Sequence, residues 1–149
     1  MSKSVVIVGA SMGGLRAAEA LRNNGFDGQI TVIGEEVHAP YNRPPLSKEV
    51  LAKEVTHDAV AFKLRAQVED VIWNLGDPAT SLDLAKQVVT TASGKTFEYD
   101  GLVIASGLRP RVLDLPNGKV SGRHTVRTLD DAIGLRAELV SGAKVVVAG

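Results

Sequence analysis

Residues 3–36 of this 149-residue chain, KSVVIVGASMGGLRAAEALRNNGFDGQITVIGEE, restrict its fold more than any other stretch. Residues 4–8 form an apolar, β-branched run, which is typical of a strand buried on both faces of a parallel sheet. A glycine-rich segment, residues 9–14, comes next, and a stretch with helical periodicity follows it. Residues 29–33 predict a second strand. The order strand, turn, helix, strand indicates an α/β fold that opens with a β-α-β unit.

The predicted helix has one apolar face, which we expect to pack against the sheet. Its members are Leu15, Ala18 and Leu21. The polar side chains are expected on the outer face, and they are Arg16, Glu19, Arg22 and Asn23. Gly25 stands where a left-handed C-terminal cap would end the helix.

The glycine-rich turn has the chemistry of a phosphate-binding loop. Unpaired N–H groups at a helix N-terminus favour a pyrophosphate, and Gly9, Gly13 and Gly14 let the backbone bend and approach a ligand. Glu35 follows Gly14 by 21 residues, close to the spacing of about 20 expected for an acid that binds adenosine ribose. Ser11 stands where a second glycine is usual. The alternative is a tight turn in an ordinary α/β sheet, but the flanking strands and the position of Glu35 favour a dinucleotide site.

Composition excludes several other classes of protein. Lys plus Arg and Asp plus Glu each number 17, so net charge predicts attraction to neither nucleic acid nor a membrane. There is no cysteine, which excludes disulfides and thiolate metal sites within the chain, and the three histidines have no metal-ligand spacing. No stretch is long and apolar enough for a membrane span, and the N-terminus lacks a signal-peptide pattern. By default we expect a cytoplasmic location.

The segment after the second strand is a proline-rich loop that leads into less informative sequence. We expect a short helix over residues 46–52, with Arg43 and Lys48 brought near the end of the second strand or simply solvated. Apolar residues alternate through residues 62–68, yet we favour a helix for the second half of residues 53–70.

The middle of the chain predicts a second kind of sheet. Residues 71–75 form a short strand in which Trp73 is core or half-buried. A turn follows at residues 76–78, and a three-stranded antiparallel meander is then expected. Its strands are residues 79–84, 87–92 and 96–99. The fold class is therefore α/β, with a parallel sheet plus an antiparallel β-meander.

The last third begins with another strand that we expect to be buried, residues 102–105, which ends in Ser106 and Gly107. A small hydroxyl residue and a glycine at a strand end suit close approach to a ligand, although a plain turn is the simpler alternative. The basic stretch 108–127 helps to bind phosphates or an acidic partner in one interpretation, and is a solvated loop in the other.

A helix is expected over residues 129–140, capped by Thr128 with acidic residues in its first turn. The chain then repeats its opening, because residues 143–149, AKVVVAG, match KSVVIVG. Such self-similarity suggests a second nucleotide-binding unit in a longer parent protein. We therefore expect one nucleotide-binding domain over residues 1–142, and at 143–149 the first strand of a second, truncated nucleotide-binding domain.

Four segments together resemble one family. They are VVIVGASMGGLRAAEALR, YNRPPLSK from Tyr41 to Lys48, LVIASGLRPR and VRTLDDA. The sequence resembles the FAD-dependent, NAD(P)H-dependent ferredoxin reductases of the rhodocoxin and putidaredoxin reductase group, within the pyridine nucleotide-disulfide oxidoreductases. This resemblance implies a Rossmann-like three-layer fold, FAD and NAD(P)H as cofactors, and a ferredoxin or similar iron–sulfur protein as partner.

The resemblance also implies roles for individual residues. The FAD pyrophosphate would face the first turn, at Gly9, Ser11, Met12, Gly13 and Gly14. Glu35 would bind the ribose, and Ala79 would meet adenine through its backbone. The remaining cofactor contacts would come from Arg43, Lys48, Ala105, Ser106, Gly107 and Arg127. Lys48, on the flavin side, is also the candidate catalytic residue, and no metal ligand is implied.

Two departures from the family pattern stand within these motifs. Asn42 replaces the usual aspartate before Arg-Pro-Pro, which removes one charge beside Arg43, and Gly13 replaces a common alanine. The sequence lacks the NADH-binding half, so the chain as given is expected to be inactive alone. The alternative function is a non-catalytic dinucleotide-binding or regulatory module.

Overall fold

The computed structural model describes residues 3–112 and 121–148. The chain divides into two compact units, each described here by itself. The first unit comprises Met1–Tyr41 and Ala61–Gly107, and the second comprises Asn42–Val60 and Leu108–Gly149. Among the described residues, no helix has the length and apolar character that crossing a bilayer requires.

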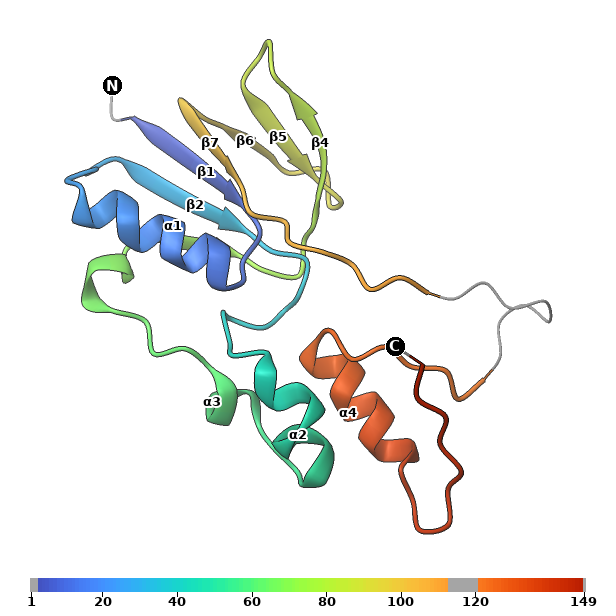
Figure 1. Ribbon diagram of the computed structural model, residues 1–149. Helices are drawn as coiled ribbons and strands as arrows, with labels where there is room; N and C mark the ends of the chain where they lie inside the picture. Colours follow the sequence, from blue (N-terminus) through green and yellow to red (C-terminus); the bar gives the residue numbers. More distant parts are fainter. Residues whose placement is uncertain (1–2, 113–120, 149) are drawn as a thin grey trace. The chain divides into compact units, whose positions relative to one another are not determined.

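A four-stranded parallel sheet forms the centre of the first unit, in the order β3-β2-β1-β7. Figure 1 labels three of these strands, β2, β1 and β7, which lie side by side. The strands of the sheet are β1 (Ser4–Val8), β2 (Gln29–Ile33), β3 (Ile72–Asn74) and β7 (Gly101–Ile104). A separate antiparallel meander is made of β4 (Ala79–Asp83), β5 (Val88–Thr91) and β6 (Thr96–Glu98). The strands predicted between residues 4 and 105, including the meander, are confirmed, with ends that differ by at most one residue.

Alternate side chains of β1 pack against different layers of the first unit, helix α1 (Met12–Asn23) on one face of the sheet and the meander on the other. Val5 and Ile7 lie in one core cluster with residues of α1, while Val6 lies in another cluster with Val89 of the meander. Because successive side chains of a strand point to opposite faces, β1 packs against the helix on one face and the meander on the other. The continuous apolar run in the sequence is explained by this burial on both faces. The predicted three-layer α/β fold is confirmed.

Helix α1 corrects one prediction about its outer face. Glu19 is buried, although its helical position predicts exposure. Its carboxylate pairs with Arg16, whose Nη1 lies 2.5 Å from Oε2, and with Arg65, whose Nε lies 3.6 Å from Oε1. The two arginines cover the carboxylate and compensate its charge, as a buried acid requires. Gly25 has φ +82°, which confirms the predicted left-handed cap.

Residues 62–70, the second half of the stretch between the proline-rich loop and β3, contain no α-helix, contrary to the helix that we favoured there. Only one 3-10 turn forms there, η2 (Ala66–Val68). Phe62 and Leu64 pack against the core at alternating positions, and Val68 is fully buried in it. The alternation visible in the sequence was the better indicator, because period-two spacing places these side chains on one side of an extended chain.

Strand β7 corrects a second prediction, that of a buried strand. Within the described residues it pairs with β1 only, at the edge of the sheet. Ile104 is 61% exposed, and the other residues of β7 are half-buried. An edge strand lacks a neighbour on one side, so its apolar side chains are only partly covered.

The second unit is helical. It contains the 3-10 helix η1 (Pro44–Ser47) and the helices α2 (Glu49–Ala52), α3 (His57–Val60) and α4 (Leu129–Glu138). The single helix predicted over residues 46–52 is interrupted at Lys48, whose backbone at φ −128° and ψ −101° is not helical. Helices α2 and α4 pack together, with Val50, Leu129 and Ala132 buried.

The ends of α4 agree with the sequence only at its start. The Thr128 side chain accepts a hydrogen bond from the Asp131 N–H at 3.1 Å, and the Asp131 carboxylate accepts one from the Thr128 N–H at 3.0 Å. This reciprocal pair is a capping box, so the predicted cap is confirmed. The strand expected after α4 is not formed over residues 143–148, and Gly149 lies outside the described residues.

We expect Leu15→Ala to lower the free energy of unfolding by about 2–5 kcal/mol, because the side chain is 1% exposed between α1 and the sheet. Urea denaturation measures the change. Leu84→Ala is the matched control, since this leucine is 73% exposed and its loss should cost less than about 0.5 kcal/mol. Equal losses in the two variants would contradict the described core.

Candidate functional site

The carboxyl ends of three strands meet at Gly9. The Gly9 N–H donates to the Ile33 carbonyl at 2.8 Å, and the Ala105 N–H donates to the Val8 carbonyl at 2.7 Å. Gly9 has φ +118°, and a Cβ at this position would lie 2.1 Å from the Ala105 carbonyl oxygen. Only glycine fits here, because a side chain would meet both backbone strain and the β7 backbone.

The N-terminus of α1 lies at the same edge of the sheet. Ser11 is its N-cap in an extended conformation and makes no side-chain capping hydrogen bond, and the first turn contains no acidic residue. Gly14 lets the helix approach the turn, since a Cβ there would lie 1.9 Å from the Gly9 carbonyl oxygen. The first N–H groups of a helix have no intrahelical acceptor, so this terminus favours an anion such as a pyrophosphate.

Glu35 lies two residues after the end of β2 and is exposed, and its neighbour Glu36 is half-buried and accepts a hydrogen bond from the Tyr41 hydroxyl at 2.6 Å. The two adjacent carboxylates therefore differ in their surroundings. Gly34, just before them, has no room for a side chain because a Cβ would lie 2.5 Å from the Ala10 Cβ. Gly34 was not singled out from the sequence. A glycine between a buried strand and a candidate binding residue such as Glu35 does, however, indicate close approach of the backbone.

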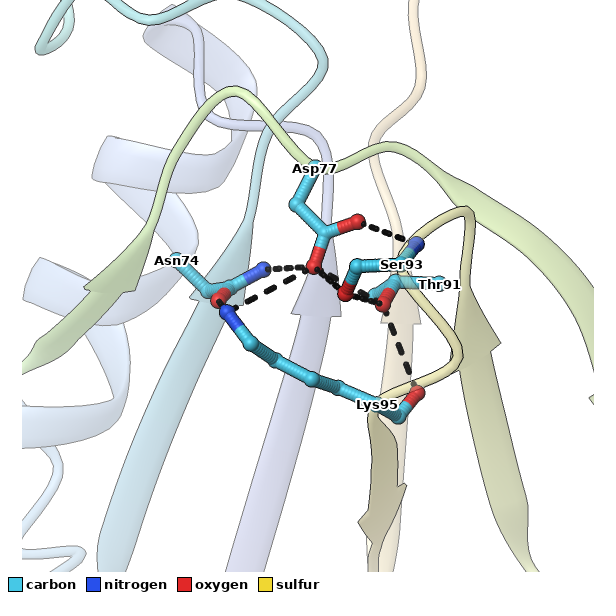
Figure 2. Close-up of polar contacts among 5 residues, drawn as sticks. All are labelled: Asn74, Asp77, Thr91, Ser93 and Lys95. Atoms are coloured by element: carbon cyan, nitrogen blue, oxygen red, sulfur yellow. Dashed lines mark hydrogen bonds and ion pairs between the residues drawn. The ribbon is translucent and has the colours of Figure 1, made fainter.

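Asp77 is the second residue that the sequence reading missed. It was interpreted only as part of a turn, yet its buried carboxylate accepts hydrogen bonds from the side chains of Asn74, Thr91 and Ser93 (Figure 2). These side chains donate to Asp77 Oδ2, and the Ser93 N–H donates to Asp77 Oδ1 at 2.9 Å. The ammonium of Lys95 also pairs with the carboxylate, since its Nζ lies 3.7 Å from Oδ2. The Ser93 hydroxyl, followed by the other donors, holds the pKa of Asp77 well below its usual range against the opposing effect of burial.

The first unit brings together most of the residues predicted to bind a cofactor. Gly9, the start of α1 and Ala105 are adjacent through the contacts above, and Gly107 follows with φ +69°. Ser106 and Gly107 are exposed. Ala79 opens β4 and pairs with Thr91. The exposed Met12 is the first residue of α1, and Gly13 follows it.

Three predicted residues lie instead in the second unit. The Arg43 guanidinium donates from Nη1 to the Arg127 carbonyl at 2.5 Å, so these two positions are adjacent. Lys48 is exposed at the break between η1 and α2. In the basic stretch, Arg109 and Arg111 are exposed, while residues 113–120 lie outside the described part of the chain. No cluster of metal-ligating side chains occurs among the residues that the structure describes.

The chain belongs to the pyridine nucleotide-disulphide oxidoreductase family, whose pattern matches residues 3–149. This membership agrees with the glycine turn, the sheet order and the meander, and it confirms the resemblance identified from the sequence.

Relatives within the family are ferredoxin reductases. The chain is 37% identical over 146 residues to the ferredoxin–NAD(+) reductase component of a p-cumate 2,3-dioxygenase system from Pseudomonas putida, covering 97% of this chain and 36% of that protein. It is 41% identical over 147 residues to a ferredoxin–NAD(P)(+) reductase from Sphingomonas sp, covering 97% and 36%. The reductase in the crystal structure of the covalent putidaredoxin reductase–putidaredoxin complex matches with a TM-score of 0.83 at 32% identity, covering 94% and 35%. The chain thus spans about a third of the length of these relatives.

We expect Gly9→Ala and Gly13→Ala to differ sharply in stability. At Gly9 the new Cβ meets strain and a 2.1 Å backbone overlap, which should cost about 2–6 kcal/mol. At Gly13 it would lie 3.5 Å from the Ala105 Cβ, an ordinary contact, and alanine should keep or raise helix stability by up to about 1 kcal/mol. Urea denaturation distinguishes them, and similar stabilities would contradict the geometry of the turn.

The Asp77 carboxylate should make stability depend on acid pH. Folding lowers its pKa, so its contribution is fully present above about pH 5 and is lost as pH falls below the unfolded value of about 3.9. We expect the stability difference between wild type and Asp77→Asn to be largest near about pH 7 and to shrink towards about pH 3. Denaturation curves across this range measure it. A difference that grows in acid would show that the carboxylate is not stabilised by its donors.

Proposed function

We propose that this chain is the FAD-binding part of an NAD(P)H-dependent ferredoxin reductase. The observation that carries the proposal is the strand–turn–helix geometry at Gly9, with the α1 N-terminus and Glu35 both at the carboxyl edge of the parallel sheet, in a chain of this family. The names of the relatives, which include ferredoxin–NAD(+) reductase, are the basis for proposing a nicotinamide cofactor and an iron–sulfur partner protein. Because these relatives are about three times as long as this chain, we propose that the reaction requires the longer protein. We therefore expect this chain alone not to oxidise NADH.

The residues of the first unit fit FAD in a defined order. The α1 N–H groups at Met12–Gly14 would hold the pyrophosphate, because Gly9 and Gly14 let the backbones of the helix and the strands pack closely enough to bring these groups to the edge of the sheet. Glu35 would accept hydrogen bonds from the ribose hydroxyls, and the Ala79 backbone would meet adenine. Ala105, Ser106 and Gly107 would lie against the cofactor from the end of β7.

The second unit would contribute basic residues. Arg43 and Arg127, joined by their hydrogen bond, would offset the negative charge of the cofactor. Lys48 would lie towards the flavin, and it remains our candidate catalytic residue. Bound FAD would supply the hydride and single-electron chemistry, which belongs to the cofactor, while the protein binds, orients and shields it.

A non-catalytic nucleotide-binding module is the alternative function. The phosphate turn and Glu35 alone would serve ADP or NAD equally well, so a flavin-specific observation is needed to distinguish the two. The absorbance spectrum of the purified chain, before and after addition of FAD, is that observation. Flavin absorbance that remains with the protein supports the reductase, whereas a colourless chain stabilised only by ADP or NAD supports the alternative.

We expect Glu35→Ala to weaken FAD binding by about 1–3 kcal/mol, because the ribose hydroxyls lose a charged acceptor. Fluorescence titration of FAD measures the affinity. Glu98→Ala, which removes an exposed carboxylate from β6, is the matched control and should bind FAD like the wild type. An unchanged affinity in Glu35→Ala would exclude the ribose role.

A further inference from the structure

We propose that Asp77 is a positioning residue for the adenosine half of the cofactor, because it ties the backbone beside Glu35 to the strand that begins at Ala79. This inference rests on the proposed function. Asp77 touches neither base nor sugar in this role. It acts through two other residues, and the contacts that join it to each lie within the first unit.

The first link runs from Asp77 to the ribose acid. The Asp77 N–H donates to the Gly34 carbonyl at 3.0 Å, and the Gly76 N–H donates to the Glu36 carbonyl at 2.9 Å. Glu35 therefore lies between two carbonyls that are both held by this turn. In addition, the Gly34 N–H donates to the Asn74 carbonyl at 2.9 Å, so the segment is bonded to both ends of the 74–77 turn.

The second link runs from the Asp77 carboxylate to the meander (Figure 2). Oδ1 accepts from the Ser93 N–H at 2.9 Å, and Oδ2 accepts from the hydroxyls of Ser93 at 2.7 Å and Thr91 at 2.9 Å. Thr91 is the strand partner of Ala79, and the Ala92 N–H donates to the Pro78 carbonyl at 2.9 Å. The start of β4, where adenine would be met, is thereby fixed to the same side chain.

The chemistry of these contacts requires a carboxylate. Each described hydrogen-bond partner of the Asp77 carboxylate is a donor, and the side chain is almost completely buried, so both carboxylate oxygens must accept. An asparagine of the same shape has one oxygen and one NH2 group. At the Oδ1 position the NH2 group would face the Ser93 N–H, and at the Oδ2 position it would face the Asn74 NH2 group and the Lys95 ammonium, which can only donate. Asp77→Asn therefore loosens the junction without removing side-chain volume.

Asp83 provides a matched control within the same meander. It ends β4 at the opposite end of the β4–β5 hairpin from Ala79, and its Oδ1 accepts from the N–H groups of Ala85 and Lys86 at 3.1 and 3.0 Å. Asp83→Asn disturbs a comparable carboxylate-stabilised turn at the far end of β4 from Ala79.

The test compares ADP with inorganic pyrophosphate, which needs the α1 terminus but neither Glu35 nor Ala79. Calorimetric titration of the full chain should show that Asp77→Asn binds ADP and FAD about tenfold more weakly and binds pyrophosphate as the wild type does. Asp83→Asn should leave all three affinities unchanged. Ser93→Ala, which keeps the carboxylate and removes one donor, should show a smaller loss for ADP and FAD and none for pyrophosphate, and it serves as the test if Asp77→Asn does not fold.

Three outcomes would overturn the inference. Wild-type affinity for ADP in Asp77→Asn, or an equal loss for ADP and pyrophosphate, would remove the positioning role while the proposed function stands. A wild-type chain that binds neither FAD nor ADP would overturn the proposed function, and this role with it. Amide hydrogen exchange of the free chain adds an independent check, since the N–H groups of Gly76 and Ala92 should both exchange faster in Asp77→Asn and not in Asp83→Asn.

Discussion

The close approach of backbone at Gly9 is the constraint on which the rest of the first unit depends. Three strand ends and the start of α1 converge there, and a single added methyl group would overlap the Ala105 carbonyl. The first N–H groups of α1, which have no intrahelical acceptor, lie at this edge of the sheet. Fold and proposed binding chemistry thus have one physical origin, since the close backbone packing that only glycine allows brings the helix terminus to the strand ends, where an anion would bind.

Local patterns in the sequence predicted this region well. Short-range rules predict the conformation of the apolar run of β1, of the glycines in the turn and of the Gly25 cap. The structure agrees with each of these predictions. The meander was predictable for the same reason, because alternating residues and turn residues define its hairpins. The roles assigned to individual cofactor-binding residues are predictions still, since they concern a ligand.

The errors arose where tertiary contacts decide the outcome. Glu19 is buried because Arg65, far away in sequence, covers it together with Arg16, and no helical periodicity contains that information. Residues 62–65 are not helical because their alternate side chains, Phe62 and Leu64, fill the core beside α1, and a single 3-10 turn follows at residues 66–68. Asp77 was read as a turn residue because its donors, Thr91 and Ser93, belong to a hairpin 14 and 16 positions away. Its importance is visible only when both segments are placed.

The central claim is that an ADP-like diphosphate binds at the first turn with its ribose at Glu35. Titration of the isotopically labelled chain with ADP, followed through backbone amide chemical shifts, tests this claim most directly. The account predicts the largest shifts at Gly9, Gly13, Gly14 and Glu35, saturating together. Saturable shifts confined to other parts of the chain, or no shifts at ADP concentrations in the millimolar range, would contradict it.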